Sequence, residues 1–260
     1  LFYDGKEYRI DWEKLEQQLA DPQTTLMILC NPQNPAGNIW DRETLARIGA
    51  LCKQYDVIVV SDEIHCDLTK PGTEYIPFAS VNDTCRDISV TCIAPTKTFN
   101  LAGLQTAAVY AENSILHHRM WRQLNTDEVA EPNAFAIQAT IAAFQYGEEW
   151  LDELREYVEK NKQYVTEFLQ EKIPLIHPVA GEATYLMWLD CRKITESGRQ
   201  FVKFIRKTSG LYVSGGNQYG RGGEGFLRVN VATSKLVVED GMQRLYESVD
   251  AWLKEERVSK

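Results

Sequence analysis

The first half of the chain alternates short apolar runs with amphipathic segments. Four of the runs have the length of strands, and their continuous hydrophobicity is typical of strands buried on both faces: 26–30, 57–61, 88–93 and 105–111. Apolar positions recur at helical spacing over 11–20, which Asp11 can cap, and over about 41–55. Buried strands that alternate with helices predict an α/β fold around a mainly parallel sheet.

From about Ser114 the pattern becomes helical. The segment 148–172 carries apolar side chains at near-helical spacing and is long enough to connect two domains, and Pro174 marks a boundary after it. The remaining pattern predicts a smaller α+β unit with strands and helices at 185–190, 196–208, 226–231 and 236–255. We therefore expect a large domain, a linking helix and a small domain at 1–147, 148–173 and 174–260.

Composition narrows the class of protein. The chain has 260 residues, a net charge of −9 and 44% hydrophobic residues, and the absence of a basic cluster argues against a nucleic-acid partner. No apolar run is long enough to span a bilayer, so we expect no membrane association. The six cysteines occur singly, without the paired spacing of zinc sites. They are interpreted as small buried hydrophobic residues of a cytoplasmic protein without a metal site.

Polar residues follow three of the predicted strands. Asn31 and Asn34 come after the first strand, Asp62 ends the second, and Lys97 lies in the loop after the third. Because ligands gather at the carboxyl ends of strands in open α/β sheets, we expect these side chains to line one site. A lysine at the mouth of a sheet can be desolvated and act as a nucleophile. Such amines form Schiff bases with carbonyl substrates and with pyridoxal phosphate.

The polar residues at the predicted strand ends are of the types that pyridoxal chemistry needs. A lysine holds the cofactor and moves a proton, a carboxylate keeps the pyridine nitrogen protonated, a donor contacts the phenolic oxygen, and hydroxyls hold the phosphate. Arg228 is a further candidate, because an unpaired guanidinium inside an apolar strand is costly and is expected to meet an anion. That anion is either a structural carboxylate or the carboxylate of a substrate.

Each candidate also has an ordinary structural interpretation. Most loop lysines are solvated, so Lys97 by itself indicates little. Asp62 could cap a helix that follows its strand, and Asn–Pro pairs are common in turns. His65 could be an ordinary half-buried histidine. The residues taken one at a time leave these alternatives open.

Four motifs occur in an order that resembles one family of enzymes. They are Asn31-Pro-Gln-Asn-Pro-Ala-Gly37, Ser61-Asp-Glu-Ile-His65, Thr96-Lys-Thr-Phe-Asn-Leu-Ala-Gly-Leu104 and Phe226-Leu-Arg-Val-Asn230. Together they closely resemble the fold-type I pyridoxal-phosphate enzymes, and most of all the MalY/PatB branch of C–S β-lyases within the class I/II aminotransferases. The resemblance covers essentially the whole chain. It implies the three-layer α/β fold of aspartate aminotransferase, N-terminally incomplete, followed by a smaller α+β C-terminal domain.

The resemblance implies roles for the polar residues at the strand ends. Lys97 would be the Schiff-base lysine and Asp62 the partner of the pyridine nitrogen, and these two residues would be catalytic. Asn34 would donate toward the phenolic oxygen of pyridoxal 5′-phosphate. His65 would lie near the position where many aminotransferases place a tyrosine.

The remaining two roles concern the phosphate and the substrate. Thr96 would contact the phosphate, and Arg228 would bind the α-carboxylate of an amino-acid substrate. Ala94 and Gln105 stand where aminotransferases of the aspartate type carry a serine and an arginine on the phosphate. The phosphate contacts are therefore expected to differ, as they do in the lyase branch.

The resemblance also predicts that the chain is the C-terminal part of a longer protein. Family members carry an upstream glycine turn and helix N-terminus that cradle the phosphate, so we expect this chain by itself to bind the cofactor weakly or not at all. The expected protein is a homodimeric C–S β-lyase of the cystathionine β-lyase type, which cleaves sulfur amino acids to thiol, pyruvate and ammonia. The alternatives are a pyridoxal-phosphate-dependent aminotransferase and an inactive fragment that keeps the fold without cofactor.

Overall fold

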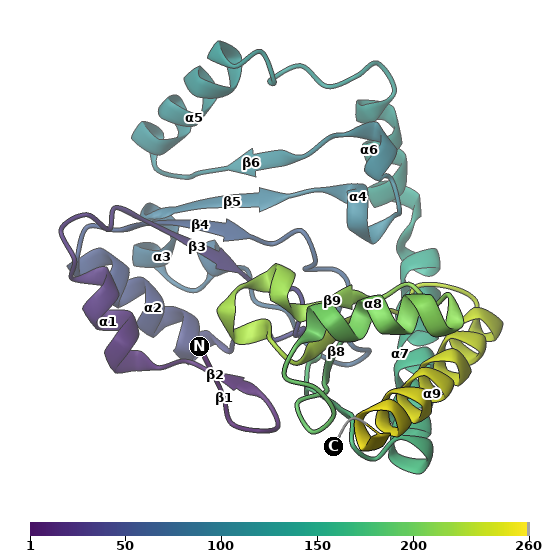
Figure 1. Ribbon diagram of the computed structural model, residues 1–260. Coiled ribbons are helices and arrows are strands. Elements are labelled where there is room, and N and C mark those ends of the chain that lie inside the picture. The colour runs from purple at the N-terminus through teal and green to yellow at the C-terminus, as the bar shows by residue number, and fades with distance from the viewer. Residues whose placement is uncertain (259–260) are drawn as a thin grey trace.

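Two four-stranded sheets organise the computed structural model, which describes residues 1–258 (Figure 1). The first sheet has the order β3-β4-β5-β6, and its strands are β3 (Leu26–Cys30), β4 (Ile58–Asp62), β5 (Ser89–Ile93) and β6 (Ala108–Tyr110). The strands β3, β4 and β5 are parallel, and β6 runs antiparallel to β5. This confirms the mainly parallel sheet that the apolar runs predict.

Three helices share a hydrophobic core with β3 and β4: α1 (Trp12–Leu19), α2 (Arg42–Gln54) and α3 (Asp83–Asp87). Asp11 caps α1, as predicted, because its carboxylate accepts a hydrogen bond from the backbone N–H of Lys14 at 3.0 Å. Asp41 caps α2 in the same way through the N–H of Thr44. Both helices therefore begin where a short acidic side chain satisfies a free N–H group.

The strand β3 is buried on one face only. Leu29 lies in the core with the three helices, whereas Ile28 is 69% exposed. Side chains alternate between the two faces of a strand, and the helical core takes the face of Leu29. The prediction of burial on both faces is therefore wrong for β3, and it is also wrong for β6, whose three residues are all exposed.

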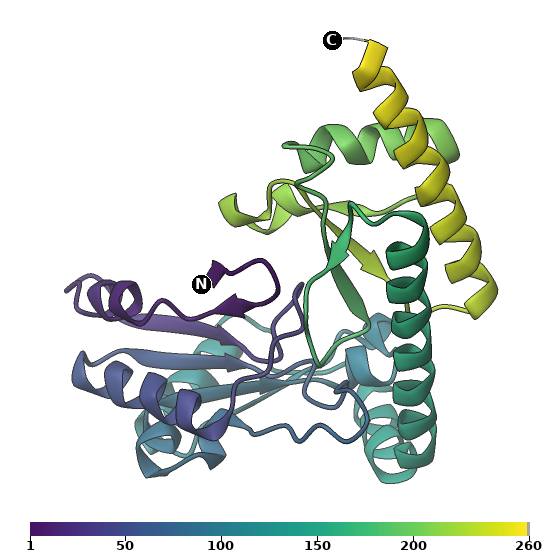
Figure 2. The same ribbon diagram turned by 90° about the horizontal axis from the view of Figure 1, so that it is seen from below.

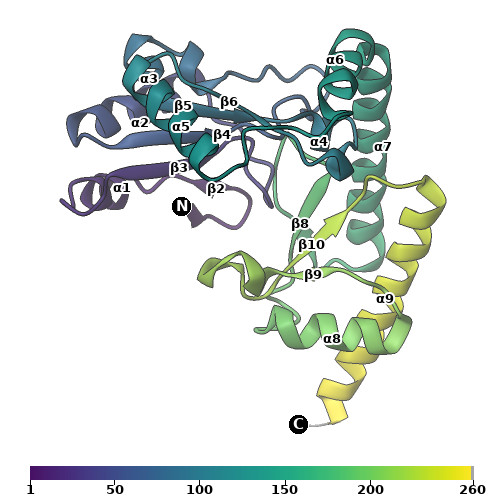
Figure 3. The same cartoon turned by 90° about the horizontal axis from the view of Figure 1, so that it is seen from above.

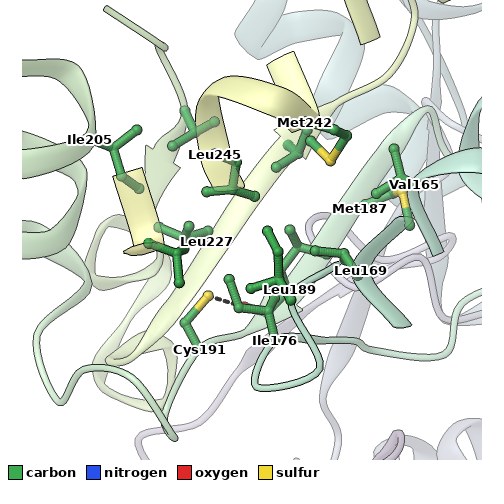
Figure 4. Close-up of a cluster of buried hydrophobic side chains, with 14 of the residues drawn as sticks. Val165, Leu169, Ile176, Met187, Leu189, Cys191, Ile205, Leu227, Met242 and Leu245 are labelled. Atoms are coloured by element: carbon green, nitrogen blue, oxygen red, sulfur yellow. Dashed lines mark hydrogen bonds between the residues drawn. The ribbon is translucent and has the colours of Figure 1, made fainter. Parts of the chain in front are cut away.

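The second sheet is antiparallel and has the order β7-β8-β10-β9, with strands β7 (His177–Pro178), β8 (Leu186–Asp190), β10 (Phe226–Asn230) and β9 (Ser214–Gly215). It shares a large core with α7 (Glu148–Lys172), α8 (Gly198–Ser209) and α9 (Lys235–Val258). The core is fully buried at Leu189 and Leu227 of the sheet and at Leu169 and Leu245 of the helices (Figure 4). Phe201 of α8 is fully buried in the same core. Burial of this apolar surface holds the three helices on the sheet.

Helix α7 runs past the ends of both sheets (Figures 2 and 3). The helical pattern that begins near Ser114 is not continuous, because it divides into α5 (Ser114–Thr126), α6 (Ala136–Tyr146) and α7. None of the helices in the described part of the chain is long and apolar enough to cross a membrane. The division into domains at 1–147, 148–173 and 174–260 stays a prediction.

A short N-terminal hairpin packs against the second sheet. It is formed by β1 (Phe2–Tyr3) and β2 (Tyr8–Arg9). The ring of Tyr3 meets Phe226 edge to face at 5.4 Å, and the hydroxyl of Tyr8 accepts a hydrogen bond from Trp188 Nε1 at 3.1 Å. The first residues of the chain therefore contact the sheet formed by its last third.

The cysteines are all free thiols. Cys52, Cys85 and Cys191 are buried, whereas Cys30, Cys66 and Cys92 are half-buried. The interpretation as small buried side chains therefore holds fully for three of the six.

A close approach of two backbone segments joins the sheets. The carbonyl of Gly37 accepts hydrogen bonds from the N–H groups of Glu182 at 2.9 Å and Ala183 at 3.1 Å. A Cβ atom at Gly181 would lie 2.0 Å from the carbonyl oxygen of Ala36. Gly37 adopts a φ of +77°, which only glycine accommodates readily. Glycine is thus required on both sides of this junction.

Gly181→Ala is expected to lower the free energy of unfolding by about 1–3 kcal/mol, because a methyl group cannot be placed against a backbone carbonyl without moving one of the two segments. Denaturant unfolding measures the change. Gly103→Ala is the matched control, since a Cβ atom at Gly103 meets nothing within 4 Å. Equal stability of the two variants would contradict the close approach.

Candidate active site

The carboxyl ends of the parallel strands meet at one edge of the first sheet. In the register of the sheet, Asp62 lies between Cys30 and Cys92. The backbone N–H of Asn31 donates to the carbonyl of Asp62 at 3.0 Å, so the Asn-Pro segment begins beside β4. After β5 the chain turns into the short helix α4 (Pro95–Thr98), which carries Lys97. The predicted strand-end residues thus come from three adjacent strands.

Lys97 lies in the short helix α4, between two threonines. The side chain is half-buried, and among residues 1–258 no hydrogen-bond or ion-pair partner is found for its Nζ atom. The neighbouring Thr98 hydroxyl donates to Asp67 Oδ2 at 2.9 Å and ties α4 to the segment that follows β4. Thr96 precedes Lys97 in the same turn and is also half-buried. The loop is therefore anchored by one hydroxyl, while the amine between the two threonines stays free.

Asp62 ends its strand in a turn and does not cap a helix. Its Oδ1 atom accepts a hydrogen bond from the backbone N–H of Ile64 at 3.2 Å, and the residues that follow form turns. The helix-cap alternative is therefore wrong. The adjacent Glu63 is 2% exposed and accepts hydrogen bonds from Phe78 N–H and the Ser61 hydroxyl, and burial raises the pKa of its carboxyl. Glu63 is therefore a buried acid held by hydrogen bonds within the protein, whereas Asp62 is half-buried at the end of its strand.

The two asparagines of the Asn-Pro segment differ in their contacts. Asn31 is fully buried, and its Oδ1 atom accepts a hydrogen bond from the Trp40 N–H at 3.2 Å, while its carbonyl accepts one from the Tyr75 hydroxyl at 2.8 Å. Asn34 is half-buried and reaches across to the second sheet. The turn interpretation therefore holds for Asn31, and Asn34 is the one placed for a ligand.

Asn34 and Arg228 connect the two sheets through their side chains. Arg228 Nη1 donates to Asn34 Oδ1 at 3.1 Å. This hydrogen bond occupies the amide oxygen, so Asn34 keeps its Nδ2 group as a donor. Within residues 1–258 no carboxylate forms an ion pair with Arg228. A structural carboxylate therefore does not account for this half-buried guanidinium, and most of its N–H donors remain for a ligand.

His65 is buried near the charged side chains of Lys97, Asp62 and Arg228. It is 3% exposed, and its Nδ1 atom is buried without a hydrogen-bond partner. Burial, together with the positive charges of Lys97 and Arg228, lowers the pKa of His65 to about 4, while the carboxylate of Asp62 acts in the opposite direction. The imidazole is therefore neutral near pH 7. Its ring also meets Tyr185 edge to face at 5.8 Å.

Helix α7 supplies polar contacts that the sequence pattern did not indicate. Arg155 Nε donates to the carbonyl of Thr69 at 3.0 Å, and Lys162 Nζ donates to the carbonyl of Ala183 at 3.0 Å. Burial lowers the pKa of Lys162 to about 8. These contacts fix the segment after His65 and the segment before Tyr185. Their only sequence signal is the seven-residue separation of Arg155 and Lys162, which puts both on one face of a helix.

The first sheet has a lysine and an aspartate at its carboxyl edge, and the second sheet contributes an arginine. This arrangement agrees with the family to which the sequence is matched. The family model for aminotransferase class I and II matches residues 2–245, and the chain belongs to this family. Cystathionine beta-lyase PatB of Bacillus subtilis (strain 168) is 43% identical over 238 residues, which are 92% of this chain and 62% of that protein. Protein MalY of Escherichia coli (strain K12) is 32% identical over 242 residues, 93% of this chain and 61% of that protein.

Solved structures show the same fold. Cystalysin from Treponema denticola, which contains a pyridoxal 5′-phosphate cofactor, superposes with a TM-score of 0.93 at 29% identity over 96% of this chain and 64% of that one. The pyridoxal-phosphate-bound C–S lyase from Staphylococcus hominis gives a TM-score of 0.84 at 33% identity over 93% of this chain and 63% of that one. The expected aspartate aminotransferase fold is confirmed. This chain spans less than two thirds of the length of each of these relatives.

Titration of His65 is expected to make the protein less stable in acid. Because the pKa of His65 is about 4 when folded and about 6.5 when unfolded, the unfolded chain binds more protons between these values. The free energy of unfolding should therefore fall as the pH falls from 6.5 to 4, by up to roughly 3 kcal/mol from this group.

Denaturant unfolding at several pH values measures this effect. His65→Gln should remove that part of the pH dependence, whereas His117→Gln, at an exposed position on α5, should keep the wild-type slope. An unchanged slope in His65→Gln would show that the buried imidazole does not titrate in this window.

Proposed function

We propose that this chain forms part of a pyridoxal-phosphate-dependent C–S β-lyase that acts on sulfur amino acids. The observation that carries the proposal is the convergence of Lys97, Asp62 and the Asn34–Arg228 pair at the junction of the two sheets. The similarity to cystathionine beta-lyase PatB supports the choice of reaction. We also propose that the protein is cytoplasmic.

The donors and acceptors on this edge fit pyridoxal phosphate. The free amine of Lys97 would bind the cofactor's aldehyde, the carboxylate of Asp62 would hold a proton on the pyridine nitrogen, and Asn34 Nδ2 would donate to the phenolic oxygen. The Thr96 hydroxyl would donate to the phosphate. His65 brings a buried Nδ1 atom without a protein partner, which a bound group at this position would satisfy. When bound, the cofactor supplies a ring that accepts the negative charge developing at the substrate Cα atom.

Each residue then has a separate task. Arg228 binds the substrate α-carboxylate through the N–H groups that Asn34 does not use. The amine of Lys97, when it is not bound to the cofactor, would remove the proton from the substrate Cα atom. The carboxylate of Asp62 would hold the proton on the pyridine nitrogen, which would favour charge transfer into the ring. His65 stays neutral and adds no further positive charge between Lys97 and Arg228.

A homodimer is the assembly that we propose. Large apolar side chains are exposed over β6, α5 and α6, among them Trp121, Phe135, Ile141, Phe144 and Tyr146. Exposed apolar surface of this extent is typical of protein interfaces. A second copy of the chain would cover part of it.

The reaction is tested by supplying the cofactor-loaded protein with cystathionine. We expect stoichiometric pyruvate and no amino transfer to an added 2-oxo acid. Lys97→Ala should abolish pyruvate formation, because Lys97 is the residue that we assign to removal of the Cα proton, and Lys160→Ala on the exposed face of α7 should match the wild type. Amino transfer without pyruvate would instead identify an aminotransferase, since both reactions share the steps that these residues perform. Neither activity in a protein that binds the cofactor would overturn the proposal.

Asp62→Asn is expected to lower kcat by two or more orders of magnitude, roughly the loss that follows removal of one charge-stabilising group from an active site. A neutral amide cannot favour the protonated pyridine nitrogen. The free energy of unfolding should change little, because the Asn side chain can still accept the hydrogen bond from Ile64 N–H. Retained kcat together with a large loss of stability would assign Asp62 a structural role.

A further inference from the structure

The Arg228 guanidinium packs over the ring of Tyr219. The Cζ atom of Arg228 lies 4.8 Å from the centroid of the Tyr219 ring, within the range of a cation–π interaction. The same guanidinium donates from Nη1 to Asn34 Oδ1 at 3.1 Å. The ring and the amide together therefore restrict the movement of the guanidinium.

A rigid aromatic group holds Tyr219 in this position. Its ring meets Trp188 edge to face, with centroids 5.6 Å apart and an interplanar angle of 89°. Trp188 in turn stacks on Phe226, with centroids 5.2 Å apart. Trp188 and Arg228 lie directly opposite each other on β8 and β10, so their side chains share one face of the sheet. Tyr219 therefore contacts both Trp188 and Arg228, which the pairing of β8 with β10 places side by side.

The backbone that carries Tyr219 depends on glycine. Between β9 and β10 the chain forms two 3₁₀ turns, η3 (Gly216–Tyr219) and η4 (Arg221–Gly223). A Cβ atom at Gly216 would lie 2.0 Å from the carbonyl oxygen of Gly223, so the two turns close on each other as only glycine permits. Gly220 between them has a φ of +103°. This closed loop sets the tyrosine above the arginine.

We propose that Tyr219 is a positioning residue that presents Arg228 to the α-carboxylate of the amino-acid substrate. The inference rests on the role proposed above for Arg228. A guanidinium binds a carboxylate through two parallel N–H···O bonds in its own plane. A ring packed against the guanidinium restricts it before the substrate arrives, which lowers the conformational entropy lost on binding. Tyr219 thus sets the affinity for the carboxylate and leaves the proton transfer at Cα to Lys97.

The test compares S-methyl-L-cysteine with its methyl ester as substrates of the cofactor-loaded protein. Tyr219→Leu should raise KM for the acid by about 2-fold to 30-fold, the range of a cation–π contribution, with kcat nearly unchanged. The KM for the ester, which has no carboxylate, should stay the same. Tyr219→Phe keeps the ring and should behave as the wild type for both compounds. An equal rise in KM for acid and ester would overturn the proposal, because a general structural defect affects both.

A second comparison separates this inference from the proposed function. Arg228→Leu should raise KM for the acid, and adding Tyr219→Leu to that variant should have no further effect. If Arg228→Leu leaves KM unchanged, the proposed role of Arg228 fails and this inference with it. If Arg228→Leu raises KM and Tyr219→Leu does not, only the inference about Tyr219 fails.

Binding of a simple carboxylate gives a readout without turnover. Propionate should raise the unfolding temperature of the wild type and of Tyr219→Phe more than that of Tyr219→Leu, because a ligand stabilises the folded state in proportion to its affinity. An equal rise in all three proteins would contradict the role of the ring.

Discussion

The site depends on one backbone contact, the approach of the segment 36–37 to the segment 181–183. Each sheet has its own core, and the contacts that join the two include the hydrogen bonds from Glu182 and Ala183 to the carbonyl of Gly37. This contact sets the distance between Asn34, which follows a strand of the first sheet, and Arg228, which lies in the second. A side chain larger than a hydrogen atom at Gly181 would force the segments apart. Gly37 and Gly181 thus allow the close approach that brings Asn34 and Arg228 within hydrogen-bond distance.

The charges around this junction explain why the buried histidine is neutral. His65 lies among two cations and one carboxylate and is shielded from water, so a further positive charge there would be unfavourable. A neutral imidazole adds no positive charge beside Lys97 and Arg228. The same burial leaves Nδ1 without a partner, which is a cost that a bound ligand would remove.

The sequence predicted the parts of the molecule that follow from local pattern. Apolar runs gave the strands, acidic caps gave the helix starts, and the parallel order put Asp62 and Lys97 at one edge. The hydrogen bond between Asn34 and Arg228 joins residues 194 positions apart, and no periodicity indicates such a contact. Tyr219 lies in a glycine-rich loop without helical or strand pattern, so the sequence did not predict the contact between its ring and Arg228. The exposure of Ile28 was missed because an apolar run does not reveal which face a neighbouring helix covers.

The most direct measurement of the central claim is the identity of the lysine that binds the cofactor. Incubation of the full-length protein, of which we propose that this chain forms part, with pyridoxal phosphate, reduction with borohydride and peptide mapping by mass spectrometry would locate the linked residue. The account predicts that the label lies on the peptide that contains Lys97. A label confined to another lysine, for example the half-buried Lys162 of α7, would contradict the assignment of this edge of the sheet as the active site.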